Sequence, residues 1–158
     1  MKPPLSSSLV GILSDTHGLL RPEAIKALRG VDYILHAGDV GDPSILDSLS
    51  AIAPLSAIRG NIDAHGPCSH LPATEVIDLH GYTFYMLHDG QALDLDPVAA
   101  GFAAVISGHS HRPLIEWRNG VLYLNPGSAG PRRFSLPVSL ALLTIRADSL
   151  EPQLVTML

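Results

Sequence analysis

Short apolar runs alternate with helix-type repeats along the N-terminal part of the chain. An apolar run bounded by polar residues predicts a buried strand, and such runs occur at Leu9–Leu13, Tyr33–Leu35 and Leu55–Ile58. Pro22 and Pro43 stand between these runs, and each is followed by apolar residues at helical spacing, so each marks the first turn of a helix. Alternating strands and helices predict a parallel sheet with right-handed crossovers.

The pattern changes after Asn61. Residues 62–73 contain glycine and prolines without periodicity and are predicted to form a loop. The turn pairs His80-Gly81 and Asn119-Gly120 then separate apolar runs, which is typical of β-hairpins. The remaining predicted elements are strands at Glu75–Leu79, Tyr82–Leu87, Ala103–Ser107, Leu114–Arg118, Val121–Leu124, Val138–Ile145 and Leu154–Met157, and a short helix at Pro97–Phe102.

These elements predict the fold class α/β, as a two-sheet βα-sandwich with helices on the outer faces. A length of 158 residues predicts a single domain that spans residues 1–158. Because the C-terminal half is mostly hairpins, a sandwich fits the pattern better than one open parallel sheet.

Composition narrows the class of protein. The net charge of −5 argues against a nucleic-acid-binding protein, which normally shows a basic stripe. Only 16% of the residues are charged, and such a low content is compatible with a surface that is covered by a second copy of the chain. The single cysteine, Cys68, excludes an internal disulfide. No signal peptide and no apolar run of about 20 residues is present, so we expect a cytoplasmic protein without a membrane anchor.

Polar residues of metal-binding type follow almost every predicted buried strand. In an extended segment, residues two positions apart point to the same side, so Asp15 with His17, and His109 with His111, are each predicted to reach one ion from an extended backbone. Carboxyl ends of strands meet at one edge of an α/β sheet, where ligands bind. The complete candidate set is Asp15, His17, Asp39, Asn61, His88, His109 and His111.

Taken one at a time, several of these residues have simpler explanations. Asp39 and Asn61 are of types that commonly form turns, and an isolated Asp-x-His triplet is weak evidence for a metal. Together the five segments are hard to explain as turns. A carboxylate such as Asp39 has two oxygens that can bridge two cations, and imidazoles mixed with carboxylates suit Mn, Fe, Ni or Zn better than Ca.

The motifs Asp-x-His, Gly-Asp, Gly-Asn, His and Gly-His-x-His, in this order, resemble those of the calcineurin-like metallophosphoesterase superfamily. The resemblance runs from about Val10 to Arg133. Two further segments narrow the resemblance: Arg59-Gly60-Asn61 and, later in the chain, Asn125-Pro126-Gly127-Ser128. They are similar to the corresponding segments of the small prokaryotic phosphodiesterases that are related to the retromer subunit of vacuolar protein sorting.

The resemblance implies a βα-sandwich that binds two divalent transition-metal ions. The family implies Mn²⁺, and Ni²⁺, Fe²⁺ or Zn²⁺ are alternatives. It assigns Asp15, His17 and His111 to one metal and Asn61, His88 and His109 to the other, with Asp39 as the bridge. Two such ions lower the pKa of a shared water, and the resulting hydroxide would hydrolyse a small phosphodiester substrate. Asn61 would also help to neutralise the developing oxygen charge, so it counts as a catalytic residue.

This chain departs from the family pattern next to Asn61. Many members carry a histidine there as a proposed general acid, whereas this chain has Ile62, which cannot donate a proton. His65 is the nearby residue with a suitable pKa, although an exposed loop histidine is an equally ordinary interpretation. Arg59 and Arg132 are candidate substrate ligands because a guanidinium group suits phosphate oxygens.

Two alternatives stay open at this stage. The first is a non-catalytic protein-interaction scaffold of the retromer-subunit kind, which would have no reason to keep every imidazole. The second is a phosphomonoesterase that uses the same site.

Overall fold

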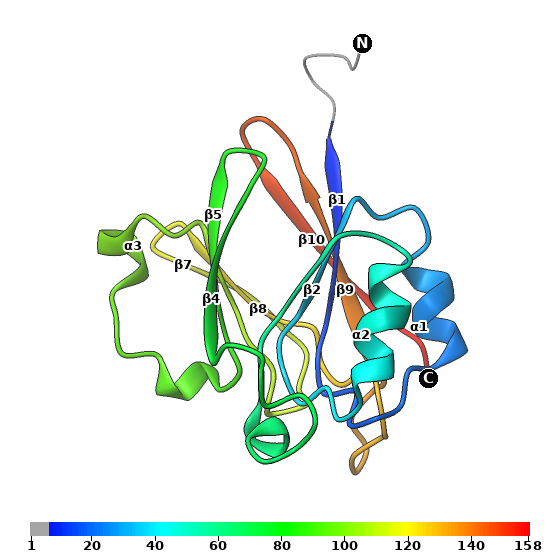
Figure 1. Cartoon of the computed structure of the whole chain (residues 1–158). Helices are drawn as coiled ribbons and strands as arrows, with labels where there is room; N and C mark the ends of the chain where they lie inside the picture. The colour runs from blue at the N-terminus through cyan, green and yellow to red at the C-terminus, as the bar shows by residue number, and fades with distance from the viewer. Residues whose placement is uncertain (1–6) are drawn as a thin grey trace.

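The computed structural model describes residues 7–158, which form two five-stranded sheets that face each other (Figure 1). The first sheet has the order β10-β9-β1-β2-β3, and the second has the order β4-β5-β6-β8-β7. The strands of the first sheet are β1 (Ser8–Leu13), β2 (Tyr33–His36), β3 (Leu55–Ala57), β9 (Ser139–Ile145) and β10 (Leu150–Thr156). Those of the second are β4 (Thr74–Leu79), β5 (Tyr82–Leu87), β6 (Ala104–Ile106), β7 (Leu114–Arg118) and β8 (Val121–Asn125).

Both sheets are mixed. In the first sheet β1, β2 and β3 are parallel, and β9 pairs antiparallel with both β1 and β10. In the second sheet β5, β6 and β8 are parallel, and the hairpin partners β4 and β7 are antiparallel. The two-sheet α/β sandwich that the sequence predicts is therefore confirmed, and so are the parallel crossovers among the first three strands.

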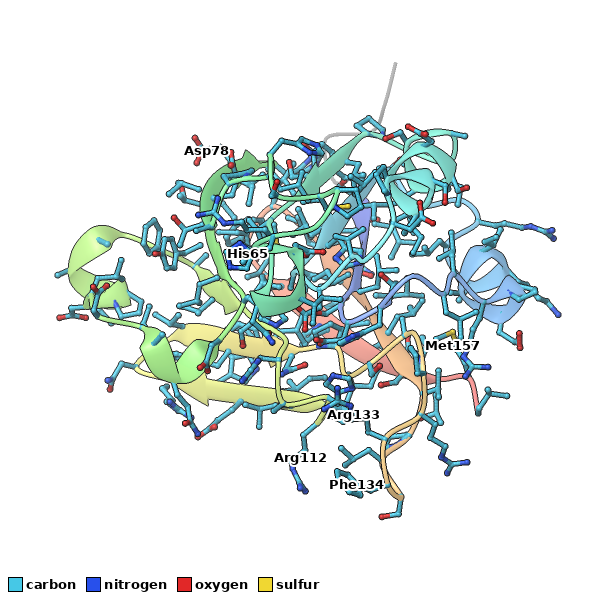
Figure 2. The ribbon with its side chains drawn as sticks, turned by 60° about the horizontal axis from the view of Figure 1, so that its bottom comes forward. His65, Asp78, Arg112, Arg133, Phe134 and Met157 are labelled. Atoms are coloured by element: carbon cyan, nitrogen blue, oxygen red, sulfur yellow. The ribbon has the colours of Figure 1, made fainter. Side chains whose placement is uncertain are left out.

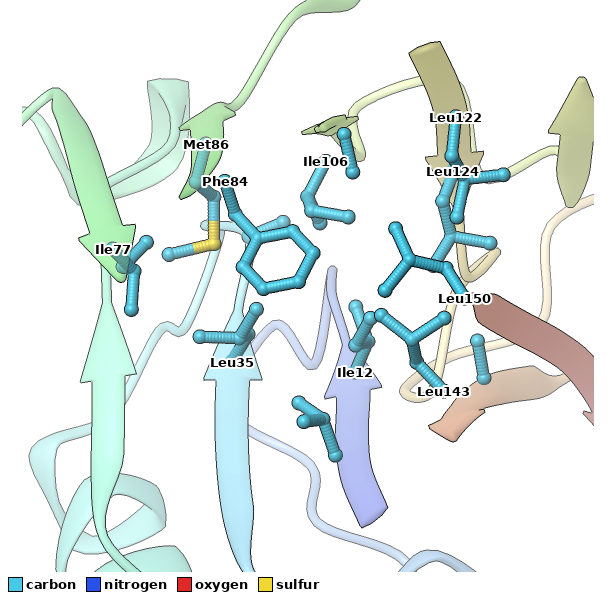
Figure 3. Close-up of a cluster of buried hydrophobic side chains, with 14 of the residues drawn as sticks. Ile12, Leu35, Ile77, Phe84, Met86, Ile106, Leu122, Leu124, Leu143 and Leu150 are labelled. Carbon is cyan, nitrogen blue, oxygen red and sulfur yellow. The ribbon is translucent and has the colours of Figure 1, made fainter. Parts of the chain in front are cut away.

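The largest cluster of buried apolar side chains lies between the two sheets. Phe84 from β5 packs in the middle of this layer, between Ile12 and Leu35 of the first sheet and Ile106 of the second (Figure 3). All four side chains are fully buried. At about 25 cal/mol for each Å² of apolar surface removed from water, this layer is a major source of the stability that holds the two sheets together.

Helices cover mainly the outer face of the first sheet. The helices α1 (Pro22–Ala27) and α2 (Pro43–Ser50) pack there through a second apolar cluster that includes Ile45 and Leu49. The second sheet carries the four-residue α3 (Pro97–Ala100) and the short 3₁₀ helix η2 (Gly90–Ala92). Another 3₁₀ turn, η1 (Asn61–Asp63), lies inside the segment that the sequence predicts as a loop.

One predicted strand is longer than its apolar run. β10 begins at Leu150, before the predicted segment Leu154–Met157, and includes Glu151 and Pro152. The antiparallel register with β9 holds these residues in the sheet although their sequence shows no apolar run. Within residues 7–158, no helix has the length and apolar character needed to cross a membrane.

Candidate metal centre

The side chains that the sequence predicts as metal ligands meet at one edge of the molecule. Five strands, β1, β2, β3, β5 and β6, each lead into a loop that carries one or two of them. Because these strands are parallel within each sheet, their carboxyl ends lie on the same side. The loops bring together Asp15, His17, Asp39, Asn61, His88, His109 and His111.

Asp15 lies at the centre of the cluster and is fully buried. Its Oδ1 atom is 3.8 Å from His17 Nε2, 3.7 Å from His88 Nε2 and 3.5 Å from His111 Nε2. This oxygen has no hydrogen-bond partner. A buried carboxylate oxygen without a partner is costly, and a cation among these imidazoles would remove that cost.

Asp39 lies between two of the histidines. Its Oδ2 atom is 3.3 Å from His17 Nε2 and 3.3 Å from His88 Nε2. Its Oδ1 atom accepts a hydrogen bond of 3.0 Å from the backbone N–H of Ile62. One carboxylate therefore contacts histidines from the ends of both sheets, which is the placement that a bridging ligand requires.

Asn61 and His109 close the other side of the cluster. The side-chain oxygen of Asn61 is 3.2 Å from His109 Nδ1. The same oxygen faces acceptor atoms, 3.1 Å from His88 Nε2 and 3.2 Å from Asp39 Oδ2. Turning the amide over would let its nitrogen donate to these atoms, whereas a cation would be bound by the oxygen as it stands.

The resemblance divides the ligands other than Asp39 into two sets, and the surroundings of the two sets differ in the structure. We call Asp15, His17 and His111 the buried set, and Asn61, His88 and His109 the cavity set. The oxygen and nitrogen atoms that the buried set offers lie within 4.8 Å of one another. All members of the cavity set line a hollow of about 500 Å³, and no member of the buried set does. The cluster is therefore accessible on the side where the cavity set lies.

The backbone reaches these positions through left-handed conformations. The φ angles are 57° at Asp15, 48° at His17, 58° at Asp39, 70° at His109 and 62° at His111. The prediction that Asp15 and His17, or His109 and His111, point to one side from an extended backbone is therefore wrong in its geometry, although both pairs do reach the cluster. Left-handed backbone is unfavourable for residues with a Cβ atom and is concentrated at functional sites in proteins.

Two glycines let the loops approach each other closely. A Cβ atom on Gly60 would clash with the Asp39 carboxylate, and one on Gly108 would clash with Ser14 and approach Asp15 Oδ2 to 2.8 Å. The loops that follow β2 and β3, and those that follow β1 and β6, therefore interlock at positions where only a hydrogen fits. These two close approaches fix the carboxylates of Asp15 and Asp39 relative to their neighbouring loops.

His36 links two of the ligand loops through hydrogen bonds. It is fully buried, and its Nδ1 atom accepts a hydrogen bond of 3.1 Å from Gly38 N–H. With Nδ1 as acceptor, Nε2 carries the proton and donates to Thr16 Oγ1 at 3.0 Å, and Thr16 in turn donates to the Val40 carbonyl at 2.9 Å. Burial lowers the pKa of His36 to about 4, so this histidine is neutral at pH 7.

Asp63 is a supporting residue to which the sequence analysis assigned no role. It is buried, and its carboxylate accepts backbone hydrogen bonds of 3.0 Å from Val40, 3.0 Å from Gly41 and 2.9 Å from Gly60. Asp63 thereby fastens the loop after β2 to the loop after β3. Its position two residues after Asn61 is visible in the sequence, but two of its three partners, Val40 and Gly41, lie more than 20 residues away along the chain.

The electrostatics of the cluster favour a cation. The neighbouring carboxylates of Asp15, and then of Asp39, raise the pKa of His17 to about 9. Burial opposes ionisation of Asp39, but the neighbouring imidazoles of His17 and His88 outweigh burial and lower the pKa of this carboxyl group. The two carboxylates therefore keep a positive charge on a neighbouring histidine. A divalent ion would supply that charge and leave the histidine neutral as a ligand.

The donor set also fits a transition metal. Imidazole nitrogens, carboxylate oxygens and one amide oxygen suit Mn, Fe, Ni or Zn. The unpartnered atoms Asp15 Oδ1 and His17 Nε2 are buried inside this set. The residues present therefore fit the cations that the sequence analysis predicts.

The sequence also named residues for proton transfer and substrate binding. Arg59 lines the 500 Å³ cavity, although its guanidinium also donates to the Leu71 carbonyl at 2.7 Å. The Arg132 side chain donates to the carbonyl of Leu136, within its own loop. Arg133, which follows it, is close enough to His111 for its charge to contribute, after burial, to a lowered pKa of that histidine.

His65 is exposed and lies just after η1. In Figure 2, in which the bottom of Figure 1 comes forward, His65 lies near the middle of the view, apart from Arg112, Arg133 and Phe134, which lie together in its lower part. His65 does not belong to the lining of the 500 Å³ cavity. The role of His65 as a proton donor therefore stays a prediction.

Comparisons with known proteins point to one family. The model of the calcineurin-like phosphoesterase superfamily domain matches residues 9–148. A probable metallophosphoesterase of Methanothermobacter thermautotrophicus is 33% identical over 93% of this chain and 91% of its own length. A second probable metallophosphoesterase, from Methanocaldococcus jannaschii, is 36% identical over 93% of this chain and 80% of its own length.

Solved structures share the fold at lower identity. Vacuolar protein sorting 29 from Cryptosporidium parvum is similar with a TM-score of 0.77 and 18% identity, over 95% of this chain and 98% of that chain. A structure described as a novel archaeal phosphodiesterase has a TM-score of 0.76 and 20% identity, over 93% and 99% of the two chains. Vps29 from Entamoeba histolytica in complex with Zn²⁺ has a TM-score of 0.69 and 21% identity, over 95% and 99%.

The family model spans most of the chain, and two relatives exceed 30% identity over nearly all of it. The motifs that carry the sequence resemblance are the same residues that meet at the edge of the sandwich. The chain therefore belongs to the calcineurin-like phosphoesterase superfamily.

Proposed function

We propose that this protein is a phosphodiesterase that uses two divalent metal ions. The observation that carries the proposal is the position of Asp39, whose Oδ2 atom is 3.3 Å from His17 of the buried set and 3.3 Å from His88 of the cavity set. In this proposal, Asp15, His17 and His111 hold one ion, and Asn61, His88 and His109 hold the other, with Asp39 shared between them.

Two bound divalent ions supply Lewis acidity and a reactive hydroxide at neutral pH. The chain supplies the geometry. Asp15 and Asp39 are held by backbone N–H groups of His109 at 3.1 Å and Ile62 at 3.0 Å, so neither carboxylate has to reorganise when charge develops on the phosphate. Asn61 offers its amide to a phosphate oxygen from the cavity side, and Arg59 and Arg132 are the proposed cationic partners of the substrate.

The surroundings of His109 favour a diester over a monoester. Besides the hollow of about 500 Å³, a second hollow of about 700 Å³ borders this residue, and the two share only Asp89 and His109. The second is lined by side chains such as Ser107, Arg112 and Tyr123. A phosphodiester has two substituents, and two hollows that adjoin one ligand residue offer a place for each. A monoester would fill only one of them.

We propose Mn²⁺ as the metal, with Ni²⁺, Fe²⁺ or Zn²⁺ as alternatives that suit the same donors. The archaeal phosphodiesterase and the Zn²⁺ complex of Vps29 are fold relatives whose descriptions name the activity and a bound metal, and both support the proposal by analogy.

The proposal is tested by comparing bis-p-nitrophenyl phosphate with p-nitrophenyl phosphate, each with Mn²⁺, Ni²⁺, Fe²⁺ or Zn²⁺ and after chelation. We expect metal-dependent turnover with a higher kcat/KM for the diester. A higher value for the monoester would replace the diester assignment by a phosphomonoesterase. The absence of turnover with every metal would contradict the enzymatic proposal and favour the scaffold of the retromer-subunit kind, which the likeness to vacuolar protein sorting 29 brings into consideration.

A separate experiment tests His65 as the general acid. If it protonates the leaving oxygen, His65→Ala should slow esters of poor leaving groups far more than nitrophenyl esters, because positioned acids contribute about 10²–10⁴-fold. His70→Ala, at another exposed loop histidine, is the control. An equal effect on good and poor leaving groups would remove His65 from the proposed mechanism. The site would then have no identified side chain to replace the acidic histidine that other members carry at the position of Ile62.

A further inference from the structure

The second sheet ends in an exposed apolar strand. β7 is the last strand of this sheet, and no described residue pairs with its outer side. Trp117 is 51% exposed, Leu114 is 42% exposed and Ile115 is 36% exposed. An unpaired edge with exposed apolar side chains is a template for pairing with another strand.

The other sheet edges carry features that hinder pairing. β10 contains Pro152 within the strand. β3 is only three residues long, and β4, which lies beside it, carries Glu75 and Asp78. Prolines, charges and short strands are the devices by which proteins protect sheet edges. β7 contains no proline, and its two charged residues, Glu116 and Arg118, are of opposite sign and pair with each other at 2.7 Å, so among the edges within residues 7–158 it is the one most open to pairing.

The hydrogen bonds of β8 show which groups of β7 are free. Leu122 N–H donates to the Ala103 carbonyl at 3.0 Å, and the Leu124 carbonyl accepts from Ser107 at 3.0 Å, so these two residues face β6. The alternate residues of β8 therefore face β7, and their partners there are Leu114, Glu116 and Arg118. It follows that Ile115 and Trp117 direct their N–H and C=O groups towards the open edge.

We propose that β7 pairs antiparallel with β7 of a second copy of this chain, about a twofold axis at Trp117. In this arrangement each Trp117 forms a hydrogen-bonded pair with its counterpart, and the two indole rings lie side by side on the same face of the sheet. Glu116 of each copy then lies opposite Arg118 of the other. The two short sheets become one continuous ten-stranded sheet, and the apolar edge is covered.

Charge selects this register over its neighbours. An axis at Glu116 would place two carboxylates opposite each other, and an axis at Arg118 would oppose two guanidinium groups. An axis at Ile115 would pair Trp117 with Pro113, which has no N–H to donate. Within one chain, Arg118 Nη2 already contacts Glu116 Oε2 at 2.7 Å, so both side chains are placed on the face that the partner's charges would meet.

The paired segment is short, so we expect a reversible dimer with a dissociation constant in the micromolar range or weaker. The pairing uses the side of β7 and no metal ligand, so its test does not depend on metal binding, although Leu114 and Arg118 also line the 700 Å³ hollow. Trp117 is the only tryptophan in the chain and therefore reports directly on the interface.

Sedimentation equilibrium and tryptophan emission across a dilution series test the dimer in the full chain. We expect the mass to fall from dimer to monomer on dilution while the emission shifts to longer wavelength. Trp117→Lys should be monomeric at all concentrations, and Trp117→Phe should retain the dimer. A wild-type chain that is monomeric at millimolar concentration, or a dimer that Trp117→Lys leaves intact, would overturn the proposal.

The register is tested by reversing charges. Glu116→Arg and Arg118→Glu should each be monomeric, because each homodimer would oppose like charges. An equimolar mixture of the two variants should form a heterodimer, because each Arg then faces a Glu. The control is Arg146→Glu, which breaks the equally exposed Arg146–Glu151 pair and should leave the dimer unchanged. Failure of the two variants to associate with each other, while each remains folded by circular dichroism, would refute this register.

Discussion

The buried set and the cavity set are built from similar side chains but are supported in different ways. Asp15 and His111 are buried, and the backbone of the loop after β1 follows the loop after β2 through hydrogen bonds of 2.8–2.9 Å at Asp15, His17 and Gly18. Asn61 and His109, in contrast, are exposed, and their side chains contact mainly other members of the cluster.

In the proposed two-metal site, this difference would separate two tasks. A preorganised, desolvated set holds an ion tightly because its ligands lose little freedom on binding. An open set would leave room for a phosphate to reach the second proposed ion. We therefore expect the buried set to bind the first and tighter metal, and the cavity set to bind a weaker one on the side where the substrate enters.

The largest effect is expected where the two sets meet. Asp39→Ala removes the carboxylate that contacts both His17 and His88, so both ions should be lost and kcat/KM should fall to a few per cent of wild type or less. Metal content and phosphodiesterase rate measure this result. Asp47→Ala, which removes an exposed carboxylate from α2, is the control. A variant that retains full activity would show that the two sets do not share Asp39.

A second prediction concerns the support of the buried set by His36. Its pKa of about 4 in the folded protein is lower than the ordinary histidine value of 6.5, so the unfolded chain takes up the proton first as the pH falls. The contribution of His36 is complete above pH 6.5 and is lost as the pH falls from 6.5 to 4. Two and a half pKa units correspond to about 3 kcal/mol.

Urea unfolding of the metal-free protein across this pH range measures the loss. His36→Asn keeps an acceptor for Gly38 N–H but does not titrate, so its stability should depend less steeply on pH than that of wild type. Equal slopes in the two proteins would mean that His36 does not become charged on unfolding, and the proposed neutral support would be wrong.

A smaller effect is expected from the close approach of the loops. Gly60→Ala adds a methyl group against the Asp39 carboxylate without removing any ligand, so metal affinity should fall by about 10–100-fold, as for other changes that misplace a ligand. Gly66→Ala is the matched control, because its Cβ would lie at an ordinary 3.5 Å from the nearest atom. Unchanged Mn²⁺ affinity in Gly60→Ala would show that the cluster tolerates a displaced carboxylate.

The sequence predicted the parts of the fold that depend on local signals. The pairs His80-Gly81 and Asn119-Gly120 have positive φ angles at all four residues and form the two predicted hairpin turns. Apolar runs located the central strands, because these strands are buried on both faces. The extent of β10 depends on pairing with β9, and no local signal marks residues such as Glu151 as part of a strand.

The members of the cluster were predictable, but their geometry was not. The residue types and their positions after predicted strands were enough to identify the candidate ligands. The left-handed backbone at Asp15 and His109 arises where loops from different strands interlock, and contacts between distant segments leave no trace in a short window of sequence. The same reason explains why the roles of His36 and Asp63 emerged only from the structure.

The comparison of the two sets is tested most directly by counting bound Mn²⁺ in wild type, His109→Ala and His111→Ala, by calorimetric titration of the metal-free proteins. We expect wild type to bind two ions with unequal affinity, His109→Ala to keep the tighter ion and lose the weaker, and His111→Ala to lose the tighter one. A single ion in wild type, or loss of the tighter ion in His109→Ala with its retention in His111→Ala, would show that the two sets do not bind separate ions in this order.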